Sequence, residues 1–164
     1  MENFVKATFD DAAELAGLAE IIWREHYTPI IGKDQVEYML ENFQSREVIG
    51  SQINEGEQSY YLIKLKGETI GYFSIKPQNN MLFLSKVYIL KPHRNTGIGK
   101  TVFHFITNEA RTVGLNGIYL TVNKNNKNSI KAYENMGLKK ESSAVTDIGN
   151  GYVMDDYIMS FKFE

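Results

Sequence analysis

A short glycine-containing loop, Arg94 to Lys100, constrains the fold of this chain more than any other segment. Before it, the apolar run LFLSKVYIL ends ahead of Pro92 and predicts a β-strand. After it, apolar residues recur at helical spacing, at Ile98, Val102, Phe105, Ile106, Ala110 and Val113. A strand that turns through glycines into a helix presents backbone N–H groups and the helix dipole to an anion. The loop therefore predicts a phosphate site, with a simple tight turn as the alternative.

The order of the remaining elements predicts one mixed α/β domain over residues 1–164. Asp11 and Glu14 have the spacing of a capping box, and a helical face follows at Ala12, Leu15, Ala19 and Ile22. Strands are expected at 4–9, 60–65, 69–75, 82–90, 117–122, 138–145 and 153–163, and further helices at 34–43, 45–53 and 126–136. This order predicts a central, mostly antiparallel mixed sheet of about seven strands with helices on both faces.

Composition narrows the possible functions. The 164 residues include 43% apolar and 23% charged residues, which is typical of a globular domain. A net charge of −2 gives no field that would attract nucleic acid. The absence of cysteine excludes thiolate catalysis and disulfides. The acidic start lacks the pattern of a signal peptide, and no run approaches the length of a membrane span, so we expect a cytoplasmic protein with no membrane partner.

Two familiar phosphate motifs do not fit the loop. A P-loop requires a glycine five residues before Gly99, where Arg94 stands. A dinucleotide fingerprint requires a third glycine three residues after Gly99, where Val102 stands. A nucleoside triphosphatase and a Rossmann enzyme are therefore disfavoured.

A third pattern fits completely: Arg or Gln, two residues, Gly, one residue, then Gly or Ala, as in Arg94-Asn95-Thr96-Gly97-Ile98-Gly99. Downstream, a second spaced pattern is filled by Asn126, Ser129, Tyr133, Gly137 and Leu138, with Ser129 in place of the commoner alanine. With these two motifs the chain resembles the GCN5-related N-acetyltransferases over nearly its whole length. The resemblance implies acetyl-CoA as cosubstrate and no metal.

The resemblance also implies a role for each motif. The backbone N–H groups of Asn95, Thr96, Gly97, Ile98, Gly99 and Lys100 would bind the cofactor pyrophosphate, with added charge from Arg94 and Lys100. The strand end Val87-Tyr88-Ile89 would pair with the pantetheine arm, and an N–H near Val87 would stabilise the carbonyl oxygen. Asn126 and Ser129 would contact the pantetheine. Tyr133 would protonate the departing thiolate as general acid.

Each role has a structural alternative. Arg94 could be a solvated surface cation, Asn126 a helix cap, and Tyr133 a core aromatic on the face of Ile130. The general base stays open among Glu25, His26, Asp155, Asp156 and a water chain. Because neighbouring strand residues point to opposite faces, at most one of the two aspartates should face the acceptor.

The segments WREHYTPIIGKDQVEYMLENFQS and MDDYIMSF are loosely similar to bacterial polyamine acetyltransferases. Carboxylates drawn from Glu20, Glu25, Asp155 and Asp156 would suit such a polycation, so the predicted partner is a small-molecule amine, first a diamine or polyamine. Protein N-termini, lysine side chains, amino acids and aminoglycosides are open alternatives as acceptors. A catalytically silent acetyl-CoA-binding regulatory or interaction module is an alternative function. An exposed edge of the last strand could support a homodimer.

Overall fold

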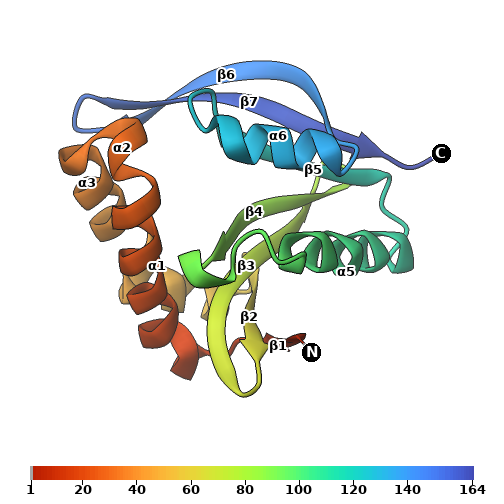
Figure 1. Cartoon of the computed structure of the whole chain (residues 1–164), viewed down its shortest axis with the longest axis horizontal. Coiled ribbons are helices and arrows are strands. Elements are labelled where there is room, and N and C mark those ends of the chain that lie inside the picture. Colours follow the sequence, from red (N-terminus) through yellow and green to blue (C-terminus); the bar gives the residue numbers. More distant parts are fainter. Residues whose placement is uncertain (1) are drawn as a thin grey trace. The chain divides into compact units, whose positions relative to one another are not determined.

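A computed structural model gives the fold and describes residues 2–164 (Figure 1). The strands are β1 (Glu2–Lys6), β2 (Ser59–Leu65), β3 (Glu68–Gln78), β4 (Met81–Ile89), β5 (Gly117–Asn123), β6 (Lys139–Gly149) and β7 (Tyr152–Lys162). The α-helices are α1 (Ala12–His26), α2 (Thr28–Ile31), α3 (Lys33–Phe43), α4 (Arg46–Glu55), α5 (Ile98–Thr112) and α6 (Lys127–Asn135). Two short 3₁₀ helices, η1 (Phe9–Asp11) and η2 (Lys91–His93), complete the order.

The strands form a seven-stranded sheet in the order β1-β2-β3-β4-β5-β7-β6. The pairs β1–β2, β2–β3, β5–β7 and β6–β7 are antiparallel, whereas β4 and β5 run parallel, with Leu82 opposite Ile118. This confirms the predicted mixed, mostly antiparallel sheet. The parallel pair is the one that a crossover helix, α5, has to connect.

Contacts between Cα atoms divide the chain into two compact units. The first comprises the chain up to Lys76 together with residues 86–99, and the second comprises 77–85 and 100–164. The prediction of a single domain stays a prediction.

In the first unit, α1 packs against α3 and α4 through the apolar face that the sequence predicted. Ala12, Leu15, Ala19 and Ile22 are all buried on it. Ser45 begins α4 by accepting a hydrogen bond from the Val48 N–H at 3.2 Å, and Gly56 ends it in the left-handed conformation. These caps place the helical boundaries within two residues of the predicted ones.

Three local predictions were wrong. Strand β1 ends at Lys6 rather than at residue 9, because Phe9 belongs to η1. The capping box is formed by Thr8 and Asp11, and not by Asp11 and Glu14. The Asp11 carboxylate accepts a hydrogen bond from the Thr8 N–H at 2.8 Å. Val113 lies one residue beyond α5 and is 64% exposed, so it does not extend the buried face of that helix.

In the second unit, the buried face of α5 includes Val102, Ile106 and Ala110. The long β6–β7 hairpin, blue in Figure 1, follows α6. Strand β5 approaches β7 closely at Gly117, where an added Cβ would lie 2.3 Å from the Phe161 carbonyl oxygen. Only glycine fits there, and the pairing of β5 with β7 continues to Asn123, which lies opposite Asp156.

Candidate active site

The loop after β4 is held in shape by its own hydrogen bonds. The His93 N–H donates to the Leu90 carbonyl at 2.9 Å, and the Arg94 N–H donates to the Lys91 carbonyl at 3.2 Å. The Thr96 hydroxyl donates to the His93 carbonyl at 2.6 Å. Hydrogen bonds within the segment 90–96 therefore define the shape of this turn.

Two residues of this loop have left-handed backbone conformations, Asn95 with φ 62° and Gly97 with φ 87°. Left-handed residues in a turn bring successive N–H groups round to form anion-binding concavities. No neighbouring atom lies within 4 Å of the position that a Cβ of Gly97 would take, and Ile98 then begins the 15-residue helix α5. The loop thus has the backbone shape, the open approach and the helix N-terminus that a pyrophosphate requires.

Arg94 links this loop to two other elements of the first unit. Its Nε donates to the Ile89 carbonyl at 2.8 Å, and its Nη2 lies 3.2 Å from Oε1 of Glu25 at the end of α1. The two side chains are 28% and 39% exposed, so Arg94 is not a fully solvated cation. The guanidinium fixes the end of β4 as well as the loop, which is a structural role that the sequence did not reveal.

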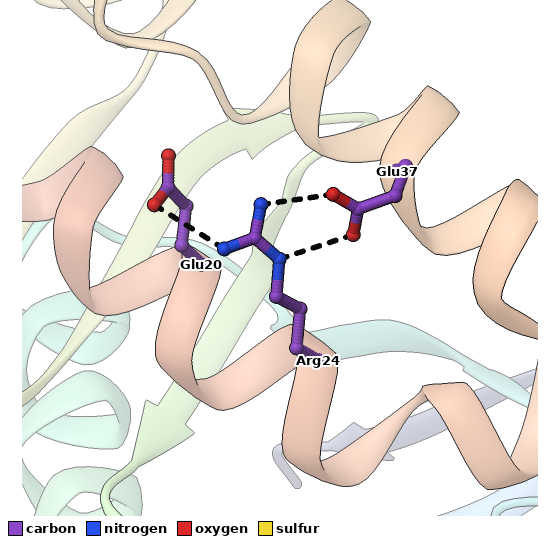
Figure 2. A network of polar contacts seen from close by, with 3 residues as sticks. All are labelled: Glu20, Arg24 and Glu37. Carbon is purple, nitrogen blue, oxygen red and sulfur yellow. Dashed lines mark hydrogen bonds and ion pairs between the residues drawn. The ribbon is translucent and has the colours of Figure 1, made fainter.

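Glu20 is also engaged, in the cluster that Figure 2 shows. Arg24 forms a fork with both carboxylate oxygens of Glu37, at 3.1 and 2.8 Å, and its Nη1 lies 3.6 Å from Glu20. The Arg24 guanidinium is the main reason that the pKa of Glu37 is lowered. Of the four carboxylates predicted for an acceptor site, Glu20 and Glu25 therefore already have arginine partners.

Aromatic rings connect the end of α1 to β4. The Tyr88 ring lies 5.8 Å from Trp23, 6.1 Å from Tyr27 and 5.4 Å from Tyr72. His26 packs edge-on against Tyr27 at 4.9 Å. The Tyr88 ring is therefore engaged in packing within the first unit, and the pairing of its backbone with a pantetheine arm stays a prediction. His26 contacts Tyr27 of the same cluster and stays a candidate for acceptor binding.

Lys86 was missed in the sequence, although it continues the buried face of Leu82 and Leu84 along β4. It is 8% exposed, donates to the Tyr60 hydroxyl, and its Nζ lies 4.9 Å from the centre of that ring. Tyr60 in turn donates to Gln52 at 2.6 Å. Burial lowers the pKa of Lys86 to about 7. The strict alternation of LFLSKVYIL was the signal that could have identified it.

We expect Lys86→Met to be more stable than the wild-type protein at pH 7, with an advantage that shrinks as the pH rises. The unfolded chain keeps the Lys86 proton up to a pKa of 10.5, whereas the folded protein loses it at about 7. Between these values the unfolded chain binds more protons, so wild-type stability rises with pH. The difference in the free energy of unfolding between Lys86→Met and the wild-type protein should fall by about 2 kcal/mol from pH 7 to pH 9.

Urea denaturation at both pH values measures this difference, with Lys131→Met on the exposed side of α6 as the control. If the free energies of unfolding of Lys86→Met and the wild-type protein differ by the same amount at both pH values, the pKa of Lys86 is not lowered.

In the second unit, the chain turns tightly from β5 into α6. The Asn126 N–H donates to the Asn123 carbonyl at 2.9 Å, and the Asn123 amide oxygen accepts from the Asn125 N–H at 2.8 Å. Asn126 occupies the N-cap position and is 4% exposed, but its side chain makes no capping hydrogen bond. The interpretation of its side chain as a helix cap was therefore wrong, and its contact with the pantetheine stays a prediction.

Tyr133 lies on α6 with Ser129, and both side chains are half-buried, whereas Ile130 is buried. Tyr133 is therefore partly buried, and its role as general acid stays a prediction beside the packing alternative. The helix ends as the sequence predicted, with Gly137 at φ 101° and the Leu138 N–H donating to the Tyr133 carbonyl at 3.1 Å.

The two aspartates of β7 differ sharply. Asp155 is 53% exposed and its Oδ1 lies 3.0 Å from Nζ of Lys124. Asp156 is 8% exposed, and its Oδ1 is buried with no hydrogen-bond partner in the part of the chain that the structure describes. Burial, and then the neighbouring charge of Asp155, raise the pKa of Asp156 to about 6. The two side chains therefore lie in different surroundings, and the prediction that at most one of them faces the acceptor stays a prediction.

Within residues 2–164, no group of three or more histidine, cysteine or acidic side chains is arranged to hold a metal ion. None of the helices in the same range is long and apolar enough to cross a membrane.

Comparisons with known proteins agree with this arrangement. The sequence model of the acetyltransferase (GNAT) family matches residues 15–138 of this chain. An uncharacterized N-acetyltransferase of Lactobacillus delbrueckii subsp. lactis is 27% identical over 141 residues, covering 79% of this chain and 82% of that protein. An uncharacterized N-acetyltransferase of Mycobacterium bovis is 22% identical over 150 residues, covering 91% and 96% of the two chains.

Solved structures show the same fold. The PaiA N-acetyltransferase of Thermoplasma acidophilum, in complex with coenzyme A, has a TM-score of 0.85 and 21% identity, with 99% of each chain covered. A chimera of the Vibrio cholerae spermidine N-acetyltransferase SpeG and hSSAT has a TM-score of 0.73 and 16% identity, covering 98% of this chain and 95% of that one. With the family matching most of its length, the chain belongs to the acetyltransferase (GNAT) family and is an acetyl-CoA-dependent N-acetyltransferase.

Proposed function

We propose that this enzyme transfers the acetyl group of acetyl-CoA directly to a primary amine of a small acceptor, with a diamine or polyamine as the first choice. The observation that carries the proposal is the loop Arg94–Gly97. Asn95 and Gly97 adopt left-handed conformations there, and the approach to Gly97 is open. These features suit a pyrophosphate in a chain that belongs to this family.

Acetyl-CoA supplies the acetyl group as an activated thioester. The backbone of Val87 to Ile89 would hold the pantetheine arm, and a fixed N–H near Val87 would stabilise the charge that develops on the carbonyl oxygen. Asn126, whose buried amide makes no cap, would hold a pantetheine amide together with Ser129. Tyr133, half-buried on α6, would donate its proton to the leaving sulfur. Direct transfer also requires the amine to lose a proton, since an alkylammonium with a pKa of about 10 is neutral in only about one molecule per thousand at pH 7.

The four acidic side chains predicted for the acceptor site differ in whether they already have a basic partner. Glu20, Glu25 and Asp155 already pair with Arg24, Arg94 and Lys124, so each of these acids would have to exchange its basic partner to bind an ammonium. Asp156 alone of the four carries a buried oxygen without a partner. This favours Asp156 as the carboxylate that binds the reacting ammonium, whether the acceptor is a diamine or a polyamine.

A panel of amines tests the proposal through coenzyme A release from acetyl-CoA. The panel contains a short diamine, spermidine, a monoamine of equal length, an amino acid, and a peptide with free N-terminal and lysine amines. We expect the highest kcat/KM for a diamine or polyamine. Preferred acetylation of the peptide would replace the small-molecule acceptor with a protein one, and no release above hydrolysis with any amine would contradict the proposed function.

A further inference from the structure

We propose that Asp156, and not Asp155, binds the ammonium of the acceptor amine and takes its proton before acetyl transfer. This inference rests on the proposed function, because it assigns the base for that reaction. The two adjacent carboxylates have the same chemistry in the sequence, and only their surroundings in the second unit distinguish them.

Asp156 lies on β7, opposite the end of β5, where the chain turns towards the second family motif. In the sheet it is directly opposite Asn123, the last residue of β5, and on its other side it is opposite Ala144 of β6. Directly paired residues of antiparallel strands have side chains on the same face, about 5 Å apart at Cβ. Asn123 begins the turn that leads through Asn125 to Asn126. Asp156 is therefore placed beside the turn from which Asn126 would hold the pantetheine.

Asp155 already forms an ion pair with Lys124, which belongs to the same turn. Its carboxylate pairs with Nζ of Lys124 at 3.0 Å, and its carbonyl oxygen accepts from the Lys124 N–H at 3.1 Å. These contacts explain Asp155 as a residue that ties the turn to β7. They also direct the ammonium of Lys124 to Asp155, so that Asp156 has no ion-pair partner among residues 2–164.

Asp156, by contrast, has a buried Oδ1 atom without a hydrogen-bond partner among the described residues. A buried polar atom without a hydrogen bond destabilises the folded protein, and such atoms are uncommon in folded proteins. The charged groups around it are Asp155 on the same strand, which opposes ionisation, and Lys124 in the turn, which favours it, while the residue opposite on β6 is the uncharged Ala144. A carboxyl with a pKa of about 6 is still mostly ionised at pH 7, and it is a stronger base than an ordinary aspartate. An acceptor ammonium would supply the missing donor.

The reaction then balances as follows. The ammonium R–NH₃⁺ gives one proton to the Asp156 carboxylate and becomes R–NH₂. The amine nitrogen forms a bond to the acetyl carbon, and the carbon–sulfur bond breaks with its electron pair on sulfur. The sulfur takes a proton, for which Tyr133 is the proposed donor, and the nitrogen loses its second proton to the tyrosinate through solvent. The amide and coenzyme A leave, and Asp156 releases its proton to water.

Asp156→Asn tests the assignment, with Asp155→Asn as the matched control on the neighbouring residue. We expect kcat/KM for the best amine to fall at least tenfold in Asp156→Asn and less than threefold in Asp155→Asn. The wild-type pH profile of kcat/KM should rise through about pH 6, and Asp156→Asn should lose that rise. Asp156→Glu, which keeps a carboxylate, should recover part of the activity.

The melting temperature of Asp156→Asn distinguishes a role of Asp156 as the base from a structural role. Because the folded pKa of Asp156 is raised above its value in the unfolded chain, ionisation at pH 7 destabilises the folded protein. Asp156→Asn should therefore melt at or above the wild-type temperature while it loses activity. Wild-type kcat/KM with an unchanged pH profile in Asp156→Asn would overturn the inference and leave the proposed function intact. A variant that melts well below the wild-type protein would overturn it too, by showing a structural role.

Discussion

Replacing Tyr133 by phenylalanine is expected to lower kcat by roughly ten- to a thousandfold, which is within or somewhat below the usual range for general acid catalysis. The ring stays in its half-buried place on α6, so only the hydroxyl is lost. The KM for acetyl-CoA should change little, since the phenol is proposed to act on sulfur as charge develops there and not to hold the cofactor in the ground state.

Single-turnover kinetics at saturating acetyl-CoA and amine measure this effect and establish that chemistry limits the rate. Tyr119→Phe is the control, because it removes a hydroxyl from a ring that stacks on Phe83 at 4.8 Å in the second unit. If Tyr133→Phe keeps the wild-type rate and differs only by about 1 kcal/mol in stability, water is the proton source and Tyr133 is a packing residue.

Gly97→Val is expected to raise the KM for acetyl-CoA at least tenfold, or about 1.4 kcal/mol. The backbone at Gly97 has φ 87°, which a branched side chain rarely adopts, and the open space at its Cβ position is where the pyrophosphate is proposed to approach. The side chain would therefore both strain the loop and block the ligand.

Gly114→Val is the matched control for that variant. Gly114 also has a positive φ, 76°, with no atom within 4 Å of a Cβ, but it lies beyond the far end of α5. Both variants should lose similar stability through backbone strain, and only Gly97→Val should lose affinity for acetyl-CoA. Equal KM values in the two variants would show that Gly97 serves the turn alone.

The sequence predicted what depends on local periodicity and on turn chemistry. The apolar face of α1, the alternation along β4 and the glycine that ends α6 all follow from interactions within a few residues. The loop at 94–97 was predictable for the same reason, because its glycine spacing fixes a backbone shape that Gly97 adopts in the structure.

The pairing of charges could not be predicted, because it depends on which segments the fold brings together. Glu25 and Arg94 are 69 positions apart in the sequence (94 − 25) and meet only because α1 lies beside the end of β4. The same applies to Lys86, whose partner Tyr60 comes from β2. Sequence reasoning allowed at most one of Asp155 and Asp156 to face the acceptor, but only the structure shows that Asp156 is the buried one and that Asp155 pairs with Lys124.

Calorimetric titration of the wild-type protein with acetyl-CoA, ATP with Mg²⁺, and NAD tests most directly whether the loop Arg94–Lys100 makes this chain an acetyl-CoA enzyme. The loop fills every place of the family pattern and lacks the glycines that a P-loop or a dinucleotide fingerprint requires. We predict saturable binding of acetyl-CoA at one site per chain and no saturable binding of the other two ligands. Saturable binding of ATP with Mg²⁺, and none of acetyl-CoA, would contradict the account.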